Sequence, residues 1–468
     1  PTGIDKSVRD YVRDAVKSGI GSAVRYKVRG DLADFPFKDP RRGEFRVSAS
    51  LQNAGYAYAP ASILARNSLP WPELNQLSAD FLIDQGSLQI LGAKASALGG
   101  NALVLSKVDA VVSNLYQGAQ VAVNAEGRGG LSDLLTLVNG SPLGGMMGDA
   151  LAQASASGPT DFRFKLGLPL AGLERTTVQG AINLQGNDLQ VRLDTPRLSR
   201  ARGSIAFSES GFSVATVQAR ALGGEVRIEG GLSTAAMPAP AGSRPMPQIL
   251  RMQGTATAEG LRQATELGLV ARLAALGTGQ STYTASLGLR AGIPELQIST
   301  SLVGMALALP EPFAKTAYVA MPLRLETTAL RAAQGPSSAS STRAMDQLQL
   351  SVGSLATVTY VRDVSGTDAR VIRGAIGVGL TADESAPMPD QGVVANINVG
   401  QVDLDAWSAV LSQSSGEAIT PGGVAAQATN AAMTYLPTNG VLRAQALTVG
   451  GRKFNHVLLG GGREGLLW

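Results

Sequence analysis

Hydrophobic and polar residues alternate along most of the chain with the period of two that is typical of β-strands. In AINLQGNDLQVRLD, residues 181–194, apolar residues occupy every second position on both sides of Gly186-Asn187-Asp188. This segment predicts a β-hairpin that has one apolar face and turns at those three residues. The residues that we assign to the apolar face of such strands are Leu88, Ile90, Ile182, Leu184, Leu189, Val191, Leu193, Val226, Ile228, Leu287, Leu289, Leu296 and Ile298.

A few segments follow the helical period instead. Residues 4–20 place apolar side chains at steps of three and four, which predicts an amphipathic helix that ends near Gly19 and Gly21. Shorter helices are expected at 131–138, 260–275 and 403–411. The fold class is therefore mostly β, with antiparallel strands and a few short helices.

An internal repeat supports one extended sheet. QGSLQILGAKASALGGNALV (85–104) matches ESGFSVATVQARALGGEVRI (209–228), and residues 439–459 are a looser third copy. Repeated hairpins at long spacing indicate a sheet that grows by the addition of similar units. The Gly-Gly pairs of the repeat permit sharp turns between the strands.

Three segments without periodicity divide the sheet. They are rich in small or helix-breaking residues, and we expect them to be flexible loops at 233–247, 331–343 and 412–430. The expected order is a helix at 1–20, then β sections at 21–232, 248–330 (with a helix near 260–275), 344–411 and 431–468.

A sheet with one apolar face must cover that face. A second sheet would make a β-sandwich, and plain core is the usual fate of alternating apolar residues. A long curved sheet would instead leave a continuous apolar groove. Small side chains such as Ala93, Ala95 and Ala97 leave space for a groove, and aromatic residues make up only 5% of the chain. The pattern alone slightly favours the sandwich, and the groove is the alternative.

Composition narrows the class of protein. The 468 residues carry a net charge of +4, with no Lys/Arg cluster interleaved with aromatics, which argues against nucleic-acid binding. A weak preference for anionic headgroups fits this charge equally well. The absence of cysteine removes disulfides, thiolate catalysis and zinc–thiolate sites, and it suits an envelope protein.

Membrane and targeting signals are missing from the sequence. No apolar run approaches the ~20 residues that span a bilayer. The chain opens at Pro1 without a signal peptide, so we expect the natural protein to begin upstream.

Candidates for catalysis or metal binding are few. The one histidine, His456, is expected to be a solvated or packed strand residue, and GTGQST (277–282) lacks the Gly-Lys-Ser/Thr ending of a phosphate loop and is interpreted as a turn. Asp403 and Asp405 give too few oxygen ligands for a divalent ion, and we expect one of them to cap the helix that carries Trp407. We therefore predict no catalytic residue, no metal ligand and no cofactor, and we do not expect an enzyme.

An ordered set of motifs nevertheless resembles one family. The chain looks like a member of the YhdP family of AsmA-like envelope proteins, and the resemblance covers nearly its whole length. The motifs that carry it are VRDYVRDAVKSG, KVRGDLADFPF, LPWPELNQLSADFLIDQGSLQI, LVNGSPL, LGLPLAGLERTTVQGAINLQGNDLQV, STSLVGMALALPEPFAKTA, MPLRLE, VDLDAW and LTVGGRKFNHVLL.

The resemblance implies a function as well as a fold. It implies a periplasmic protein of a Gram-negative bacterium, anchored in the inner membrane through a helix that this segment lacks. It also implies a bridge-like lipid-transfer protein, whose long curved sheet conducts phospholipid acyl chains toward the outer membrane and supports the permeability barrier. The expected partners are phospholipids and the two membranes, and the thirteen apolar residues named above are candidates for the lipid groove. The alternative is a non-enzymatic envelope scaffold with a closed core and no lipid; a passenger domain of a surface adhesin is a weaker one.

Two further expectations concern the rim of the sheet. Phe35, Phe37 and Trp71 are expected to brace a corner where the sheet begins, because the neighbouring prolines cannot donate ladder hydrogen bonds. Arg192 and Arg227 alternate with apolar residues, so they either meet lipid phosphates or belong to a solvated outer face.

Overall fold

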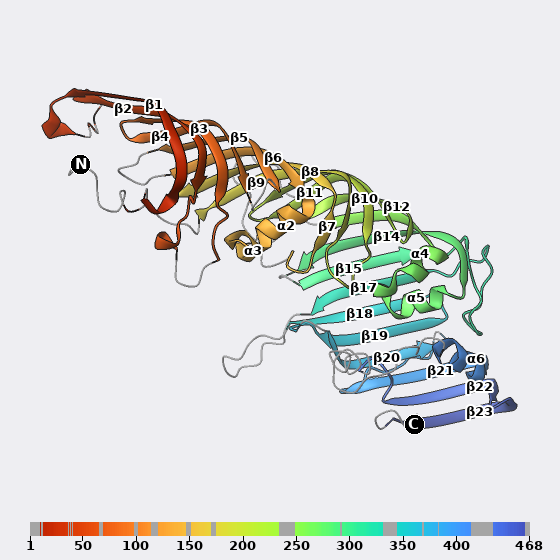
Figure 1. Cartoon of the computed structure of the whole chain (residues 1–468). Coiled ribbons are helices and arrows are strands. Elements are labelled where there is room, and N and C mark those ends of the chain that lie inside the picture. Colours follow the sequence, from red (N-terminus) through yellow and green to blue (C-terminus); the bar gives the residue numbers. More distant parts are fainter. Residues whose placement is uncertain are drawn as a thin grey trace, which may run out of the picture. The chain divides into compact units, whose positions relative to one another are not determined.

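The chain consists mainly of β-strands that belong to one open, mostly antiparallel sheet (Figure 1). The computed structural model describes residues 10, 13–35, 37, 39, 41–64, 69–97, 102–113, 120–146, 151–169, 175–233, 249–290, 293–330, 344–366, 369–381, 383–412 and 434–463. Within these residues the sheet contains 23 strands. The predicted fold class, a curved and mainly antiparallel sheet with few short helices, is confirmed.

The chain forms two compact units, and the first comprises Pro1–Ala219 with Ala235–Met246. Its strands are strongly bent and open in Figure 1, where β1 and β2 lie at one end. Its elements are β1 (Val16–Gly30), η1 (Leu32–Asp34), β2 (Gly43–Tyr56), η2 (Ala61–Ile63), β3 (Leu74–Asp84), β4 (Ser87–Ala97), β5 (Leu103–Ser113), β6 (Gln120–Gly130), α2 (Leu131–Asn139), α3 (Pro142–Met146), β7 (Ser155–Ser157), β8 (Pro159–Pro169), β9 (Thr177–Gln190), β10 (Leu198–Ser208) and β11 (Gly211–Ala221), at whose end the unit stops.

The second unit comprises Arg220–Thr234 and Pro247–Trp468. Its elements are β12 (Gly223–Ser233), β13 (Ile249–Thr257), α4 (Ala258–Gln263), η4 (Thr265–Leu267), α5 (Leu269–Ala274), β14 (Gly277–Arg290), β15 (Ile293–Thr300), β16 (Met305–Leu307), β17 (Leu323–Leu330), β18 (Met345–Val352), β19 (Ala356–Asp363), β20 (Arg370–Val378), β21 (Gly392–Asp403), α6 (Leu404–Ser412), β22 (Asn439–Val449) and β23 (Arg452–Gly462).

Strands pair mostly with their neighbours in sequence. In the first unit the ladder runs from β1 through β2, β3, β4, β5, β6, β8 and β9 to β10, and every pairing is antiparallel. In the second unit it runs from β12 through β13, β14, β15, β17, β18, β19 and β20 to β21, β22 and β23. The two pairings of β21 are parallel, which the sequence analysis did not predict.

The core of the first unit is built from small residues. Ala93, Ala95 and Ala97 of β4 are buried beside leucines and valines of β3 and β5, and Leu134 and Leu137 of α2 pack against this cluster. Because alanine dominates, the sheet buries its apolar face without bulky interdigitation, as the scarcity of aromatic residues predicts.

Where aromatics occur, several lie over a glycine of the next strand. Phe162 is the register partner of Gly127, and Tyr360 is the partner of Gly374. A Cβ added at Gly127 would stand 2.6 Å from the Phe162 ring, and one at Gly374 would stand 2.3 Å from the Tyr360 ring. Each glycine therefore provides the space in which the ring lies flat against the sheet.

The aromatic corner braces the start of the sheet, as predicted. Phe35 stands edge-on to Phe45 at 5.1 Å and to Phe37 at 5.9 Å, and Phe37 is fully buried. Trp71 packs against Tyr58 with a centroid distance of 5.9 Å.

Three local predictions are wrong. The helix predicted at 4–20 cannot reach Gly19, because β1 begins at Val16 and pairs with β2; residues 1–9, 11 and 12 lie outside the described part. GTGQST does not form a turn but begins β14. There β14 pairs with β16, and a Cβ at Gly279 would stand 2.2 Å from the Gly304 carbonyl oxygen, so glycine permits this close approach.

The predicted hairpin turn at residues 186–188 is a bulge inside the continuous strand β9. Asn187 is fully buried: its Oδ1 accepts from the Gln185 amide at 2.7 Å, and its Nδ2 donates to the Ser157 and Pro159 carbonyls at 3.0 and 2.9 Å. The side chain thus satisfies backbone groups from two segments, and the strand continues past Gly186.

Other local predictions are confirmed. Helices occur near 131–138 and 403–411, while the one predicted at 260–275 is divided into α4, η4 and α5. Asp403 caps α6 by accepting a hydrogen bond from the Ala406 amide at 2.9 Å. His456 is an exposed residue of β23, and the Gly450–Gly451 pair turns sharply between β22 and β23, with positive φ at both glycines. The predicted flexible loops lie almost entirely outside the described residues, except Ser233 at the end of β12 and Ser412 at the end of α6.

Candidate functional site: the apolar face of the sheet

One face of the second unit carries an apolar row that crosses the strands. Successive register partners place one small or aliphatic residue on each strand of the ladder from β12 to β21, which does not include β16. The row is Ile228, Met252, Ala285, Ile298, Leu325, Leu350, Val358, Ile376 and Ala395. At about 4.8 Å between neighbouring strands, it extends roughly 40 Å.

A second row lies two residues away along each strand and is also mainly apolar. It begins at Val226, crosses β13 at Gly254, and passes Tyr283 and Thr300, the two positions with a hydroxyl group. It then continues through Leu323, Val352, Ala356, Val378, Ile397, Leu442 and Leu459. Together the two rows form an apolar strip along the sheet, which we call the second-unit strip.

The first unit has the same organisation. Its apolar row passes through Ala49, Phe81, Ile90, Ala110, Val123, Leu166 and Val178. Leu88 lies beside this row, between its partners Ile83 and Val112. We call this surface the first-unit strip.

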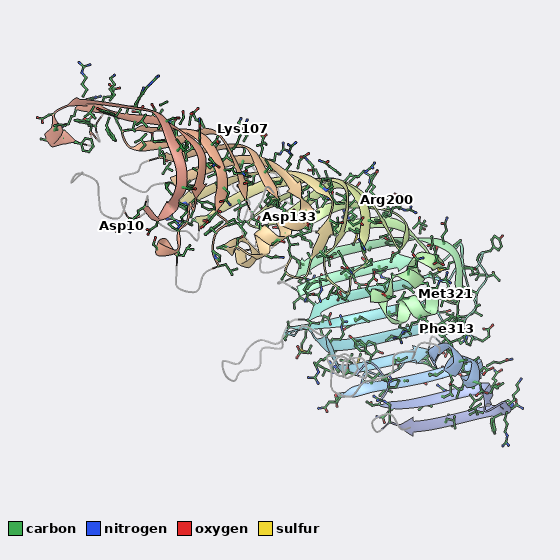
Figure 2. The ribbon with its side chains drawn as sticks, in the orientation of Figure 1. Asp10, Lys107, Asp133, Arg200, Phe313 and Met321 are labelled. Atoms are coloured by element: carbon green, nitrogen blue, oxygen red, sulfur yellow. The ribbon has the colours of Figure 1, made fainter. Side chains whose placement is uncertain are left out.

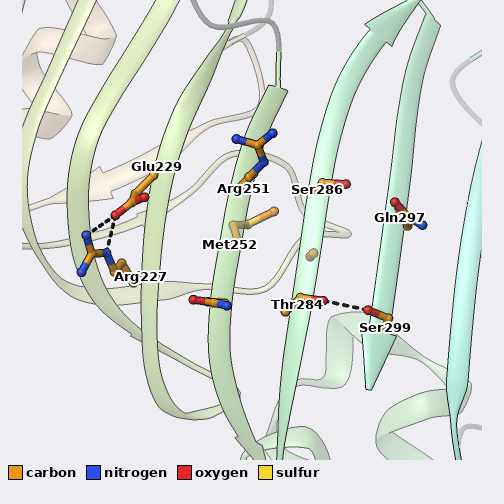
Figure 3. Close-up of a pocket in the computed structure, with 10 residues that line it drawn as sticks. Arg227, Glu229, Arg251, Met252, Thr284, Ser286, Gln297 and Ser299 are labelled. Atoms are coloured by element: carbon orange, nitrogen blue, oxygen red, sulfur yellow. Dashed lines mark hydrogen bonds and ion pairs between the residues drawn. The ribbon is translucent and has the colours of Figure 1, made fainter. Parts of the chain in front are cut away.

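The opposite face of the second unit is polar. Figure 3 shows a hollow there, and the side chains of this polar face that line it are Arg227, Glu229, Arg251, Gln253, Thr284, Ser286, Gln297 and Ser299. Thr284 and Ser299 share a hydrogen bond of 2.7 Å across β14 and β15. Arg227 is paired with Glu229 on this face, which is the solvated position that the sequence analysis considered for it.

The structure places eleven of the thirteen candidate residues in strands of the sheet, most of them opposite apolar partners. Leu88 and Ile90 lie in β4, and Ile182, Leu184 and Leu189 lie in β9. In the second unit, Val226, Ile228, Leu287, Leu289, Leu296 and Ile298 lie in β12, β14 and β15. Leu287 faces Leu250 and Leu296, and Ile182 faces Phe162 and Ile205.

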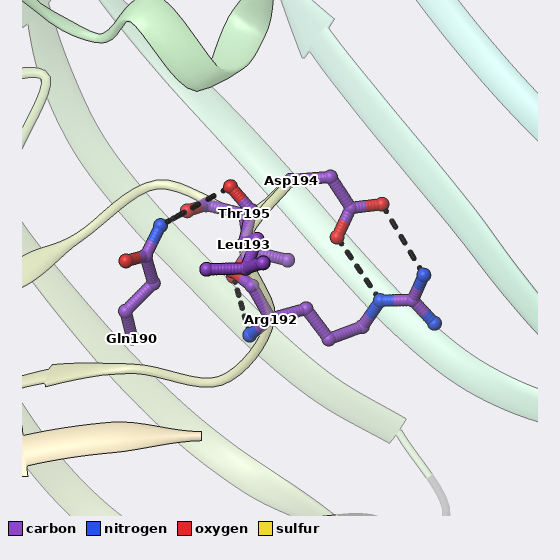
Figure 4. Close-up of polar contacts among 5 residues, drawn as sticks. All are labelled: Gln190, Arg192, Leu193, Asp194 and Thr195. Carbon is purple, nitrogen blue, oxygen red and sulfur yellow. Dashed lines mark hydrogen bonds and ion pairs between the residues drawn. The ribbon is translucent and has the colours of Figure 1, made fainter. Parts of the chain in front are cut away.

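Val191 and Leu193 do not join them, because β9 ends at Gln190. They lie in the following turn and are 45% and 74% exposed. Figure 4 shows how Gln190 Nε2 donates to the Thr195 carbonyl at 2.9 Å and Thr195 Oγ1 accepts from the Arg192 amide at 3.1 Å. In the same turn Arg192 is paired with Asp194 at 3.0 Å.

A buried ion pair lies on the apolar side, and sequence reasoning missed it. Asp346 of β18 and Arg362 of β19 are register partners, and Arg362 Nε donates to Asp346 Oδ1 at 2.9 Å. The two side chains are only 5% and 14% exposed. The signal in the sequence is Asp346 itself, which occupies the position that Leu348 and Leu350 occupy further along the same strand.

Tyrosines surround this ion pair. Arg362 Nη1 donates to the Tyr435 hydroxyl at 3.4 Å, and the Tyr360 hydroxyl donates to the Tyr435 carbonyl at 2.8 Å. Burial, together with the neighbouring Tyr435, raises the pKa of Tyr360 to about 12. The hydroxyl of Tyr360 therefore stays protonated at neutral pH and keeps its hydrogen bond.

Metal sites and membrane-spanning helices are both absent from the described part of the chain. No group of three or more His, Asp or Glu side chains there is arranged to hold a metal ion. Among the helices of that part, none combines the length and the apolar character needed to cross a membrane.

Comparison with known proteins gives one positive result. A family model described as YhdP protein matches residues 1–468, which is the whole chain. The comparisons with curated proteins and with solved structures find no match.

Proposed function

Because the chain belongs to the YhdP family, we propose that it is a segment of a periplasmic lipid-transfer bridge between the inner and outer membranes. Phospholipid acyl chains move along the apolar strips, and the headgroups remain in water at the open side of the sheet. The role of such a bridge is to supply the outer membrane and support its permeability barrier. The protein performs no bond chemistry in this role.

The observation that carries the proposal is the continuity of the second-unit strip. A core that only stabilises a fold needs apolar contacts wherever elements pack, whereas transport needs similar apolar contacts at every step. Each strand of the ladder from β12 to β21 offers one such contact in the row through Ile298. The strip is also open, since among the described strands β12 does not pair with β23.

The expected binding energy is large but evenly distributed. Each CH₂ group removed from water contributes ~0.8 kcal/mol. A chain of some sixteen carbons therefore gains roughly ten kcal/mol before entropy is subtracted. Side chains of similar size along the row let the lipid exchange one set of contacts for an equivalent set, so that it slides instead of remaining at one site.

The test compares two adjacent positions of β15. Ile298 belongs to the apolar row, between Ala285 and Leu325, and Ser299 belongs to the polar face. Ile298→Asp places an unpaired carboxylate among acyl chains, at a cost of several kcal/mol. Ser299→Asp adds the same charge to the same strand, but on the polar face, and is therefore the matched control.

Lipids that co-purify with the full chain are measured by mass spectrometry after detergent-free purification, with circular dichroism to check the fold. We expect stoichiometric phospholipid in the unmodified chain and in Ser299→Asp, and its loss in Ile298→Asp. A folded chain that carries no lipid, or an Ile298→Asp variant with normal lipid, would reject the bridge and favour an envelope scaffold.

A further inference from the structure

The connection between β15 and β17 exposes a compact group of apolar side chains. Val303 is 46% exposed, Tyr318 is 94% exposed and Val319 is 55% exposed. We call the backbone segments that carry them, residues 301–304 and 316–321, the tip. Side chains of this kind normally turn inward, so a loop that presents three of them to solvent calls for a ligand.

The tip has a defined backbone conformation. The Gly304 amide donates to the Ala317 carbonyl at 2.8 Å, and the Met321 amide donates to the Ser301 carbonyl at 2.9 Å. These two bonds hold the segments side by side, so Val303 lies at the same end as Tyr318 and Val319.

The ammonium group of Lys315 stabilises the backbone of the tip through hydrogen bonds. Its Nζ donates to the Leu302 carbonyl at 2.8 Å and also to the Met305 carbonyl, so it bridges the turn that carries Val303. The side chain is buried, and no carboxylate of the described residues forms an ion pair with it. Burial of an ammonium group is costly, and here its partners are the carbonyl group of Leu302 in the tip and that of Met305 at the start of β16.

The segment that precedes the tip also contacts α6. The Phe313 ring, labelled in Figure 2 near Met321, stands edge-on to Trp407 at 5.9 Å. Trp407 Nε1 donates to the Glu311 carbonyl at 3.4 Å. The base of the tip is therefore fixed on two sides, while Tyr318 projects freely into solvent.

The chemistry of the tip indicates what it contacts. Residues 299–310 and 316–323 contain no Asp, Glu, Lys or Arg. Three exposed side chains cover far less than the roughly 800 Å² per partner of a stable protein interface. A bilayer surface requires no shape complementarity, and tyrosine favours its interfacial region, where the ring is in apolar surroundings and the hydroxyl is in water.

We propose that the tip inserts Val303, Tyr318 and Val319 shallowly into the interfacial region of a lipid bilayer. The contact is weak and reversible, because each side chain contributes separately and no basic cluster adds attraction to anionic lipid. This inference goes beyond lipid transfer, since the tip is not part of the second-unit strip.

The experiment measures flotation of the full chain with phosphatidylethanolamine–phosphatidylglycerol vesicles. We expect the unmodified chain to float, and the double variant Tyr318→Ser/Val319→Ser to lose about tenfold or more of its partitioning. Leu32→Ser is the control, because Leu32 is 74% exposed but lies in η1 between the carboxylates of Asp31 and Asp34, and its partitioning should not change. An unmodified chain that stays at the bottom of the gradient, a double variant that floats normally, or an equal loss in Leu32→Ser would overturn the proposal.

Two comparisons separate the tip from the groove and from a protein partner. Ile298→Asp should still float, and the double variant should keep its co-purified lipid; if the two properties are lost together, the tip has no membrane role of its own. A photoreactive benzophenone residue at position 318 should form adducts with vesicle lipids. Adducts with protein alone, in whole envelopes, would replace the bilayer with a protein partner and reject the proposal.

Discussion

The ring of Phe207 lies over Gly180, its register partner across β9 and β10. A Cβ built at Gly180 would stand 2.3 Å from Phe207 Cζ and 2.6 Å from the Arg163 carbonyl oxygen. The position therefore has no room for a methyl group on that face, and the backbone oxygen cannot move aside without breaking the ladder with β8.

We expect Gly180→Ala to lower the free energy of unfolding by about 1–3 kcal/mol, which is the usual cost of inserting a carbon into a packed site. Gly400→Ala in β21 is the control, because a Cβ there meets nothing within 4 Å. Urea unfolding measures both variants. Equal stability of the two would show that the Phe207 contact is not restrictive.

The buried pair of Asp346 and Arg362 gives a second prediction. Arg362→Met leaves Asp346 buried without its partner, so the free energy of unfolding should fall by about 3–5 kcal/mol. The double variant Arg362→Met/Asp346→Leu removes both charges and should recover most of this loss, since apolar replacement of a whole buried pair is often neutral. Urea unfolding of the single and double variants forms the test. A double variant as unstable as the single one would contradict the argument.

The raised pKa of Tyr360 gives a third prediction, for alkaline pH. The pKa of Tyr360 is about 12 in the folded chain, and a tyrosine in an unfolded chain has a pKa of about 10. The folded state thus favours the protonated hydroxyl: its contribution is complete below pH 10 and is lost as the pH rises from 10 to 12. Over that interval the free energy of unfolding should fall by up to about 1.4 kcal/mol per pH unit from this one group.

Tyr360→Phe isolates this contribution from those of other titrating groups. It should be less stable than the unmodified chain at pH 8, because the hydrogen bond to the Tyr435 carbonyl is lost. The difference between the two chains should then shrink between pH 10 and 12, as measured by urea unfolding at each pH. A constant difference would mean that Tyr360 titrates normally.

The period-two alternation was sufficient to predict an extended sheet and most of its apolar face. Leu287 and Leu296 alternate with polar neighbours, and they are in fact register partners within the sheet. This succeeds because the face of a strand residue depends only on its place in the alternation. It fails at Val191 and Leu193, because the pattern does not show where a strand ends.

The local errors have a shared cause, which is that the deciding partner is distant in sequence. Gly186-Asn187-Asp188 is a typical turn sequence, but Asn187 binds the Ser157 and Pro159 carbonyls, and these keep β9 continuous. Gly279 looked like a turn residue, yet the Gly304 carbonyl requires it. The helical spacing of residues 4–20 was overridden at Val16 by pairing with β2.

The parallel pairing of β20 with β21 has a practical consequence. It requires the chain to return across the sheet between the two strands, and Glu384 and Ser385 of this return lie against the polar face. There Glu384 accepts from Asn398 Nδ2 at 3.0 Å and pairs with Arg443 at 2.7 Å. Residues that follow Ser385 in this return therefore give an attachment point for a fluorophore or an affinity tag. A probe placed there would lie on the polar face and would leave the second-unit strip on the opposite face uncovered.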